Sequence, residues 1–388
     1  MSYDLVLLGG TGFTGGLTAK YLAEHAPSGL RWALAGRNPA RLAQLRERLA
    51  AEHSSAAEVP LITVDSAEPG RVRELAEQSR VVVSTVGPYL QYGEPLVAAC
   101  AAAGTDYLDL TGEPEFVDLM YARYHATAER SGARLVHCCG FDSIPPDLGV
   151  YYAMQQLRPD GPVRVAGLVR AGGSASGGTV ASALGVLGRP RQSAVAARAR
   201  AAVEPRPGGR LVATGLDRPR RIDGLWAVPL PTIDAQVVAR SARALAEYGP
   251  QFQYHHYAGF RRLPVALAAG AGGAGLIAAA QLPPVRSLLG RRFRPGSGPS
   301  AEQRARGWFR VRVVADSAER QLVTEVSGGD PGYGETAKML AEAALCLVTD
   351  EVPAQAGQLT PAAAMGQALI TRLTRAGIEF RTVRDTAR

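Results

Sequence analysis

The chain is poor in several residue types, and each shortage excludes a class of protein. Four cysteines stand among its 388 residues, namely Cys100, Cys138, Cys139 and Cys346. None of them has the CxxC or Cys/His spacing of a zinc site, so we expect no metal. Lysine occurs only as Lys20 and Lys338, and the net charge of +8 therefore rests on arginine. The arginines are interspersed with Asp and Glu instead of forming a basic run, so we expect no nucleic-acid partner.

We also expect no secretory leader at the start of this sequence. Asp4 and the glycines that follow interrupt the first apolar run, unlike the apolar core of a secretory leader. The adjacent Cys138 and Cys139 lie in an apolar run, which indicates buried thiols in a reducing compartment. With 46% hydrophobic and 20% charged residues, the composition is that of an ordinary soluble globular protein. We therefore expect a cytoplasmic protein.

One run without polar side chains, Val265–Ala280 within the apolar segment 264–284, needs separate weighing. It is shorter than the roughly 20 apolar residues that cross a bilayer, and Pro264 and Pro283 bound it. We favour a buried helix or the lining of a substrate channel. Flanking arginines support a second interpretation, in which the segment contacts an anionic membrane surface from one side.

The first 150 residues alternate short apolar runs with amphipathic segments. The expected strands are DLVLLG, RWALAG, LITVD, RVVVSTV, DYLDL and ARLVHC. The expected helices cover Phe13–Glu24, Pro39–Glu52, Pro69–Gln78, Glu94–Ala103 and Glu115–Arg130. Strands that alternate with helices and are rich in Val, Leu and Ile are typical of a parallel sheet buried on both faces. We therefore expect a doubly wound α/β domain of the Rossmann type over 1–150.

After residue 150 the pattern changes to longer strands of alternating polarity, in PVRVAGLVRAGG and FRVRVVADSAERQLVTEVSGG. Such strands suit an antiparallel sheet with one open face. We expect a second, α+β domain with a mixed or antiparallel sheet over 151–330, interrupted by Pro/Arg-rich loops at 204–223 and 291–307. Two helices, YGETAKMLAEAALCLV and TPAAAMGQALITRLTRAGIEF, are expected to close the chain over 331–388.

Five glycines within eight residues follow the first expected strand. Six residues, from Gly10 to Gly15, fit the pattern G-x-G-x-x-G between a strand and a helix, the context of a dinucleotide-binding turn. Glycine permits the tight turn and the close approach of the backbone to a pyrophosphate, which the N-terminus of the helix then binds. The residues expected to contact the dinucleotide here are Gly9, Gly10, Thr11, Gly12, Phe13, Thr14 and Gly15.

The end of the second strand indicates which dinucleotide is bound. A site that prefers NAD places an acidic residue there for the ribose 2′-hydroxyl. This chain has Arg37 and Asn38 instead, with Arg41 one turn further on. A guanidinium can donate paired hydrogen bonds to a 2′-phosphate. We therefore expect NADP(H).

Further candidates stand at the other strand ends, because ligands of such sheets lie outside the carboxyl ends of the strands. Asp65 and Ser66 follow the third strand, where the adenine is expected. The fourth strand ends in STVGP, which adds Thr85, Val86, Gly87 and Pro88. After the sixth strand, Asp142 or Ser143 is expected to cap a helix that begins with Pro145 and Pro146.

Several long motifs make a family resemblance specific. GGTGFTG, AGRNPARL, STVGPYLQYGEPLVAACAAAGTDYLDLTGE and CCGFDSIPPDLG resemble the saccharopine dehydrogenase-like NADP-binding family, and most of all its trans-acting enoyl reductase subfamily. The later stretches GGTVASAL, PGSGPS and GDPGYGETAKMLAEAALCL resemble it too, so the match spans nearly the whole chain. The resemblance implies a Rossmann domain, a substrate-facing sheet and C-terminal helices that return to the first domain. It also implies NADPH-dependent reduction of a carbon–carbon double bond in a polyketide or lipid intermediate, free or carrier-bound.

Such a reduction needs a proton donor, and the resemblance supplies none. From their positions after strand ends, we take Tyr89, Asp142 and Ser143 as the catalytic candidates, with Tyr92 and Glu113 as further donors. His137 is expected to be a core histidine. His255 and His256 are adjacent on a strand and should therefore point to opposite faces, so that one of them could reach the substrate.

Two other functions stay open at this point. Amino-acid-metabolising relatives in the family reduce an imine, although no pair of arginines for two substrate carboxylates is evident. A nucleotide-binding, lipid-associated protein without turnover is the second alternative, because no acid/base pair stands out. We also expect that the chain could form a homodimer.

Overall fold

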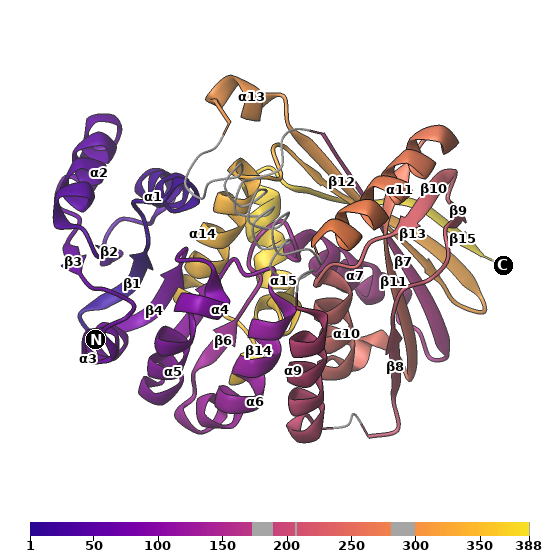
Figure 1. The fold of residues 1–388 in the computed structure, drawn as a ribbon, viewed down its shortest axis with the longest axis horizontal. Helices are drawn as coiled ribbons and strands as arrows, with labels where there is room; N and C mark the ends of the chain where they lie inside the picture. Colours follow the sequence, from indigo (N-terminus) through magenta and orange to yellow (C-terminus); the bar gives the residue numbers. More distant parts are fainter. Residues whose placement is uncertain (173–188, 206–207, 281–298, 388) are drawn as a thin grey trace.

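The structure is a computed structural model that describes residues 1–172, 189–205, 208–280 and 299–387. Two β-sheets lie side by side, each with helices packed against it, and the helices of the chain end lie between them (Figure 1). Within the described residues, the strands form one seven-stranded and one eight-stranded sheet. We call them the N-terminal sheet and the C-terminal sheet.

The N-terminal sheet is parallel throughout, with the strand order β14-β6-β5-β4-β1-β2-β3. Its strands are β1 (Tyr3–Leu8), β2 (Trp32–Gly36), β3 (Leu61–Thr63), β4 (Ser79–Ser84), β5 (Asp106–Asp109), β6 (Arg134–Val136) and β14 (Gly357–Leu359). The intervening helices are α1 (Phe13–His25), α2 (Pro39–Glu52), α3 (Pro69–Gln78), α4 (Tyr89–Tyr92), α5 (Glu94–Ala103) and α6 (Pro114–Ser131), with a 3-10 turn at Ser54–Ala56. The expectation of a doubly wound α/β fold is confirmed.

Burial explains why these segments form this sheet. Leu5, Leu7 and Val83 face one hydrophobic core with α1, α2 and α14 (Gly334–Thr349), whereas Val6 and Val82 face a second core with α3, α5 and α6. Successive residues of a strand point to opposite faces, so a run that is apolar throughout needs a helical layer on each side.

The C-terminal sheet is mixed, with the order β15-β13-β12-β7-β11-β10-β9 and with β8 paired to β11. Its strands are β7 (Pro162–Gly172), β8 (Leu211–Thr214), β9 (Arg220–Ile222), β10 (Leu225–Pro229), β11 (Gln251–Phe260), β12 (Trp308–Asp316), β13 (Arg320–Gly328) and β15 (Glu379–Ala387). The neighbours β7 and β11 are parallel, and β12 is antiparallel to β7. The segment 204–223, expected to be a loop, contains β8 and β9.

One face of the C-terminal sheet is covered by α7 (Ile144–Leu157) and α10 (Asp234–Ala244). The buried residues Val165, Tyr254 and Val313 pack there against Val150 and Met154 of α7. Further helical segments are α9 (Pro190–Val203), α13 (Ala301–Ala305) and a 3-10 turn at Ala246–Tyr248. Of the loop expected at 291–307, residues 291–298 lie outside the described residues, and the described part contains α13.

The end of the chain joins the two sheets. Helix α14 packs on α1, and α15 (Pro361–Arg375) packs on α14 and α7. Sequence analysis predicted both helices but missed the strands beside them. Strand β14 becomes an edge of the N-terminal sheet by pairing with β6, and β15 becomes an edge of the C-terminal sheet by pairing with β13.

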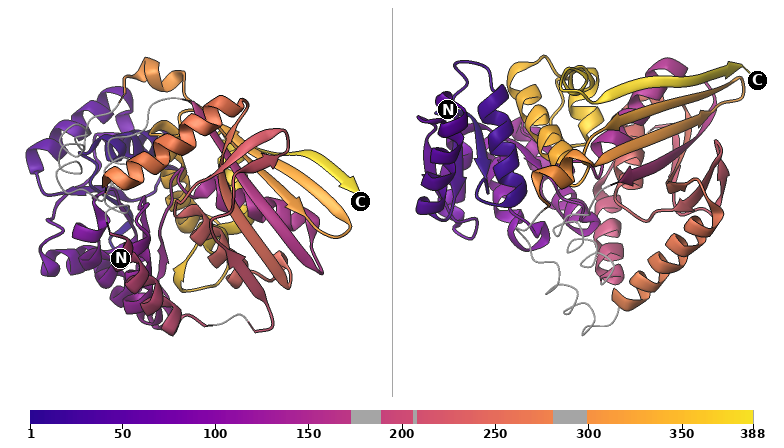
Figure 2. Two further views of the ribbon diagram at one scale, coloured as in Figure 1. Left: turned by 45° about the vertical axis from the view of Figure 1, so that its right-hand side comes forward. Right: turned by 90° about the horizontal axis from the view of Figure 1, so that it is seen from above.

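The apolar segment at 264–284 is described as far as residue 280, where it forms helix α11 (Leu263–Ala280). Figure 2 shows this helix at the periphery of the molecule, beside β10 and β11. Its described side chains are mostly exposed, including Leu263 at 40%, Val265 at 50% and Leu267 at 65%. The interpretation as a buried helix is therefore wrong for these residues. Among the described residues, no helix is long and apolar enough to cross a membrane.

Candidate active site

The glycine-rich turn lies between β1 and α1, at the carboxyl end of the central strand. Gly9 has a φ of +94°, a left-handed conformation that favours glycine, and its N–H donates to the carbonyl oxygen of Ala35 over 3.0 Å. The Gly12 N–H donates back to the Gly9 carbonyl oxygen over 3.0 Å and closes the turn. The first N–H groups of α1 then point out of the turn without acceptors in the helix, as an anion requires.

Two glycines of this turn have different surroundings. A Cβ on Gly15 would lie 2.2 Å from the Gly9 carbonyl oxygen and 2.6 Å from Thr85 Oγ1, so protein atoms exclude a side chain. A Cβ on Gly12 would meet only the Gly9 carbonyl oxygen, at 3.4 Å. Residues 11 and 12 are exposed. The space beside Gly12 is therefore open to a pyrophosphate.

At the end of β2, Arg37 and Arg41 are exposed, and neither has a carboxylate partner within the described part of the chain. Asn38 caps α2, because its side-chain oxygen accepts from the Arg41 N–H over 3.0 Å. This bond fixes the first turn of α2, which carries Arg41. Two unpaired guanidinium groups at this position fit a 2′-phosphate.

The next two strand ends also reach this edge. Asp65 accepts from the Ala67 N–H over 3.0 Å and forms the turn after β3, which also contains Ser66. After β4, the Thr85 hydroxyl donates to the Leu8 carbonyl oxygen over 3.2 Å and thereby joins the ends of β1 and β4. Val86 and a cis Gly87–Pro88 peptide bond follow. These residues lie where sequence analysis expected them to meet a dinucleotide.

The position of Tyr89 does not suit a proton donor. Its side chain is only 6% exposed, and its hydroxyl donates to the Ser84 carbonyl oxygen over 3.0 Å while it accepts from the Leu110 N–H over 3.2 Å. Glu113 holds the same turn, because its carboxylate accepts from the backbone N–H groups of Tyr89 and Leu90. These contacts favour a structural role for both side chains.

Asp142 offers a better donor. Its side chain is partly exposed at the carboxyl edge of the N-terminal sheet, and burial, together with the negative charge of Asp234, raises its pKa to about 7. Burial also raises the pKa of Asp234, at the start of α10, to about 7. The nearby His256 does not compensate this charge, because burial lowers its pKa to about 3. Asp142 can therefore carry a proton near neutral pH.

Asp234 and His256 come from the second half of the chain. His256 Nε2 lies 3.7 Å from Asp234 Oδ2, and Nδ1 of the same ring lies 2.8 Å from the Tyr254 hydroxyl oxygen. His255 points the other way and is hydrogen-bonded to the Gly215 carbonyl oxygen, as the strand periodicity predicts. The sequence around Asp234 does not indicate a role in the site, because Asp234 begins α10 whereas its partner Asp142 follows β6, far away in the sequence.

Two further candidates are buried near the same edge. Ser143 stands at the N-cap position of α7, but its side chain makes no capping hydrogen bond and finds no partner among the described residues. The expectation that it caps the helix is therefore wrong, whereas the prolines in the first turn are confirmed. His137 is buried and bonds Asp109 Oδ2 over 2.7 Å, as expected of a core histidine.

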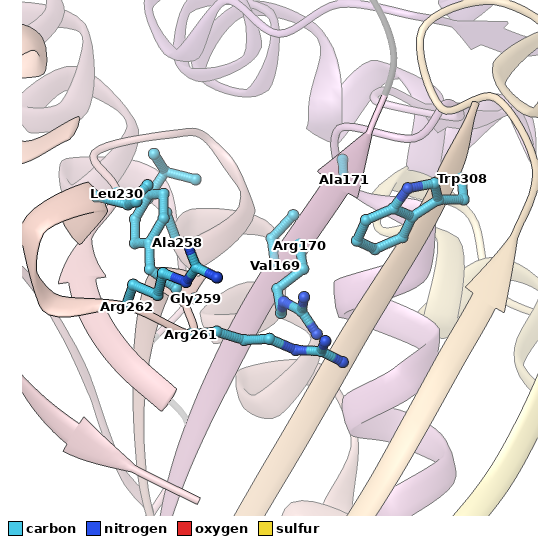
Figure 3. A pocket seen from close by; sticks show the side chains of 11 residues that line it. Val169, Arg170, Ala171, Leu230, Ala258, Gly259, Arg261, Arg262 and Trp308 are labelled. Atoms are coloured by element: carbon cyan, nitrogen blue, oxygen red, sulfur yellow. The ribbon is translucent and has the colours of Figure 1, made fainter. Parts of the chain in front are cut away.

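A cavity of about 470 Å³ lies at the ends of β7 and β11, beneath the start of α11 (Figure 3). Its lining includes Leu230, Phe260 and Val265 together with Arg170 and Trp308. This end of the sheet is connected to the glycine-rich turn through Gly307, which packs on Asp330, and through Tyr333, whose ring contacts that of Phe13 at 4.6 Å. Val265 of α11 lines this cavity. The expectation that this segment lines a substrate channel stays a prediction, as does membrane contact.

Comparison with known proteins agrees with this geometry. Residues 5–136 match the family model of the saccharopine dehydrogenase NADP-binding domain. The chain is 39% identical to a candidate trans-acting enoyl reductase of Mycobacterium tuberculosis, with 98% of each chain covered. It is 37% identical to the trans-acting enoyl reductase of Mycobacterium ulcerans, over 97% of this chain and 96% of the other. The chain belongs to the saccharopine dehydrogenase-like NADP-binding family.

The fold of a solved relative supports this assignment. Saccharopine dehydrogenase of Saccharomyces cerevisiae is 13% identical and superposes with a TM-score of 0.55, covering 98% of this chain and all of that one. The matching family model and the relatives at 37–39% identity show that the protein is an NADP(H)-dependent oxidoreductase. The residues present fit the cofactor, since the glycine-rich turn leaves room beside Gly12, and Arg37 and Arg41 are unpaired within the described residues.

Proposed function

We propose that the protein is a trans-acting enoyl reductase, which reduces a carbon–carbon double bond in a polyketide or lipid intermediate with NADPH. The names of the relatives at 37–39% identity support the reaction type. The observation that carries the proposal is Asp142, a carboxyl group with a pKa of about 7 at the carboxyl edge of the cofactor-binding sheet. A group with such a pKa is matched to proton transfer near neutral pH.

In this reaction, bound NADPH supplies a hydride for the β-carbon of the conjugated double bond. Negative charge develops on the carbonyl oxygen, and the α-carbon then needs a proton. Asp142 supplies that proton in our proposal, while the glycine-rich turn and the arginines at the end of β2 hold the dinucleotide. Ser143, whose buried hydroxyl has no partner among the described residues, is the candidate to orient Asp142 or the substrate oxygen.

The test is NADPH oxidation with defined acceptors. The protein is mixed with NADPH and an α,β-unsaturated acyl thioester, and separately with a 2-oxo acid and an amine. We expect oxidation with the thioester and a product two hydrogen atoms heavier, with deuterium from labelled NADPH on the β-carbon. Oxidation only in the presence of the 2-oxo acid and the amine would assign imine reduction instead.

The exposure of α11 supports a second, compatible proposal. Leu263, Val265 and Leu267 are exposed apolar side chains, and Arg261 and Arg262 directly precede them. Apolar side chains next to cations suit the boundary of an anionic membrane. We therefore propose peripheral contact through the start of this helix in a protein that otherwise works in the cytoplasm.

A further inference from the structure

An arginine-lined hollow of about 300 Å³ overlaps the cavity beneath α11, with which it shares Arg170, Arg261 and Trp308. Its described lining consists of Arg170, Arg261, Arg310 and Trp308. These residues come from the ends of β7 and β11 and from the start of β12, far apart in the sequence. Figure 3 shows the guanidinium groups of Arg170 and Arg261 beside each other.

The register of the sheet brings two of these cations together. Arg170 on β7 stands directly opposite Arg310 on β12, and like charges in this position destabilise a sheet. The Arg170 guanidinium also lies 5.5 Å from the centre of the Trp308 ring, which holds it at the hollow. Burial and the positive charges of Arg261, Arg310 and Arg312 lower the pKa of Arg170.

Glu325 attracts Arg170 electrostatically, but its carboxylate is ion-paired with Arg312 and Arg381 and not with Arg170. Arg312, next along β12, is paired with Asp223 and Glu325, whereas Arg170, Arg261 and Arg310 have no ion pair among the described residues. The sequence adds a second argument, because segments 173–188 and 281–298 contain neither Asp nor Glu. Three arginines that converge without an ion pair among the described residues leave an electrostatic cost that an anionic ligand would lower.

The residues of the neighbouring cavity indicate which chemical class of anion would bind. Leu230, Phe260 and Val265 line it beside Arg170, Arg261 and Arg262, so the full site combines arginines with apolar side chains. A small dicarboxylate would leave the apolar part in contact with water. A ligand with a phosphoryl group at one end and an uncharged organic chain at the other contacts both parts, and arginine forms paired hydrogen bonds with phosphate oxygens.

We propose that Arg170, Arg261 and Arg310 bind the phosphate of a pantetheine thioester, the form in which an acyl substrate is held by a carrier protein or by coenzyme A. The identity of this ligand rests on the proposed enoyl reduction. The anion-binding site itself rests only on the arrangement of the arginines. A phospholipid head group offers the same phosphoryl chemistry, so the experiment has to separate the two sources.

The experiment compares 4′-phosphopantetheine with pantetheine, which lacks only the phosphate. Binding is measured by titration calorimetry to the NADPH-saturated protein, for the wild type and for the variants Arg170→Gln and Arg310→Gln. We expect 4′-phosphopantetheine to bind about 10-fold or more tightly than pantetheine, since charged hydrogen bonds contribute at least that factor. Each variant should reduce this difference, and added salt should weaken it.

Arg164→Gln is the matched control. Arg164 lies on the same strand and the same face as Arg170, six residues and therefore about 20 Å away. This variant should bind like the wild type. Melting temperatures and NADPH affinity close to those of the wild type would show that the variants are folded.

Several results would overturn the proposal. Equal binding of the two pantetheines, or variants that behave like the wild type, would mean that no phosphate is recognised here. A variant that loses binding to vesicles with anionic phospholipid but retains 4′-phosphopantetheine would assign the arginines to a lipid head group. Competition by glutarate but not by inorganic phosphate would assign them to carboxylates. If 4′-phosphopantetheine binds but no enoyl thioester is reduced, the proposed function fails and the site stands.

Discussion

A Cβ atom on Gly15 would lie 2.2 Å from the carbonyl oxygen of Gly9, closer than any van der Waals contact. Gly15→Ala should therefore push α1 away from the turn. Overpacking of this kind costs about 1–3 kcal/mol, so we expect a lower melting temperature as well as weaker NADPH binding. Thermal unfolding with and without NADPH measures both effects.

Gly12→Ala is the counterpart, because a Cβ there meets no protein atom closer than 3.4 Å. Its melting temperature without cofactor should be close to that of the wild type, whereas its NADPH affinity should fall about 10-fold or more as the methyl group occupies the pyrophosphate space. Equal loss of stability in both variants would contradict the difference that we infer between the two glycines.

The exposed guanidinium groups of Arg37 and Arg41 should determine the preference for NADPH over NADH. In the double variant Arg37→Ala and Arg41→Ala, we expect NADPH affinity to fall about 10-fold to 100-fold, while NADH affinity changes little. Fluorescence titration with each nucleotide measures this. Arg48→Ala, an exposed arginine later on α2, is the control. An equal loss for both nucleotides would mean that the pair does not contact the 2′-phosphate.

Asp142→Asn should lower kcat of the proposed enoyl reduction about 100-fold or more, because the proton donor is lost. With a pKa of about 7, the carboxyl group is protonated below pH 7 and loses its proton above it. The rate of the wild type should therefore fall as the pH rises through 7. Asp234→Asn removes the negative charge that helps to raise this pKa, so the fall should move to lower pH. Unchanged profiles in both variants would exclude Asp142 as the donor.

The buried carboxyl group of Asp147 should make the free energy of unfolding depend on pH. This residue is buried in α7, and burial raises its pKa to about 7 although it accepts hydrogen bonds from Ser241 and Ala362. Because the pKa in the folded state lies above the ordinary value of 3.8 for an aspartate, the folded state binds the proton more tightly. Its contribution to stability is present below about pH 4 and is lost as the pH rises to 7.

Asp147→Asn cannot lose a proton, so the free energy of unfolding of the variant relative to the wild type should rise between pH 4 and pH 7 and level off above that. Urea titrations at several pH values test this. The other buried groups, including His256 with its opposite shift, are common to both proteins and cancel in the difference. A difference that stays constant with pH would mean that Asp147 titrates normally.

The start of α11 should contact membranes if its exposed apolar side chains have that role. Leu267 is 65% exposed, so Leu267→Glu should leave the fold intact and weaken flotation with anionic vesicles. Ala269→Glu is not a suitable control because it lies on the same helix. Val383→Glu is the control, because Val383 lies on the edge strand β15 and is an exposed valine, at 40%. Equal flotation of the wild type, Leu267→Glu and Val383→Glu would contradict the proposed membrane contact.

The sequence by itself determined strands β1 to β6 of the N-terminal sheet. A strand buried on both faces needs a continuous apolar run, and a helix between two such strands needs apolar residues at helical spacing, so both signals are local. The glycine-rich turn also gives a local signal, because the positive φ of Gly9 and the close contact at Gly15 allow few other residues at these positions. The arginines at the end of β2 could likewise be found from their position after a strand.

Only the tertiary structure decided which distant residues meet. Strands β14 and β15 are short or polar and become strands because existing sheet edges pair with them. The parallel pairing of β7 with β11 and the antiparallel pairing with β12 bring Arg170, Arg261 and Arg310 to one hollow. Asp142 acquires its raised pKa from burial and from Asp234, on a different helix. Charge and desolvation act through space, so their effects depend on neighbours that no local pattern specifies.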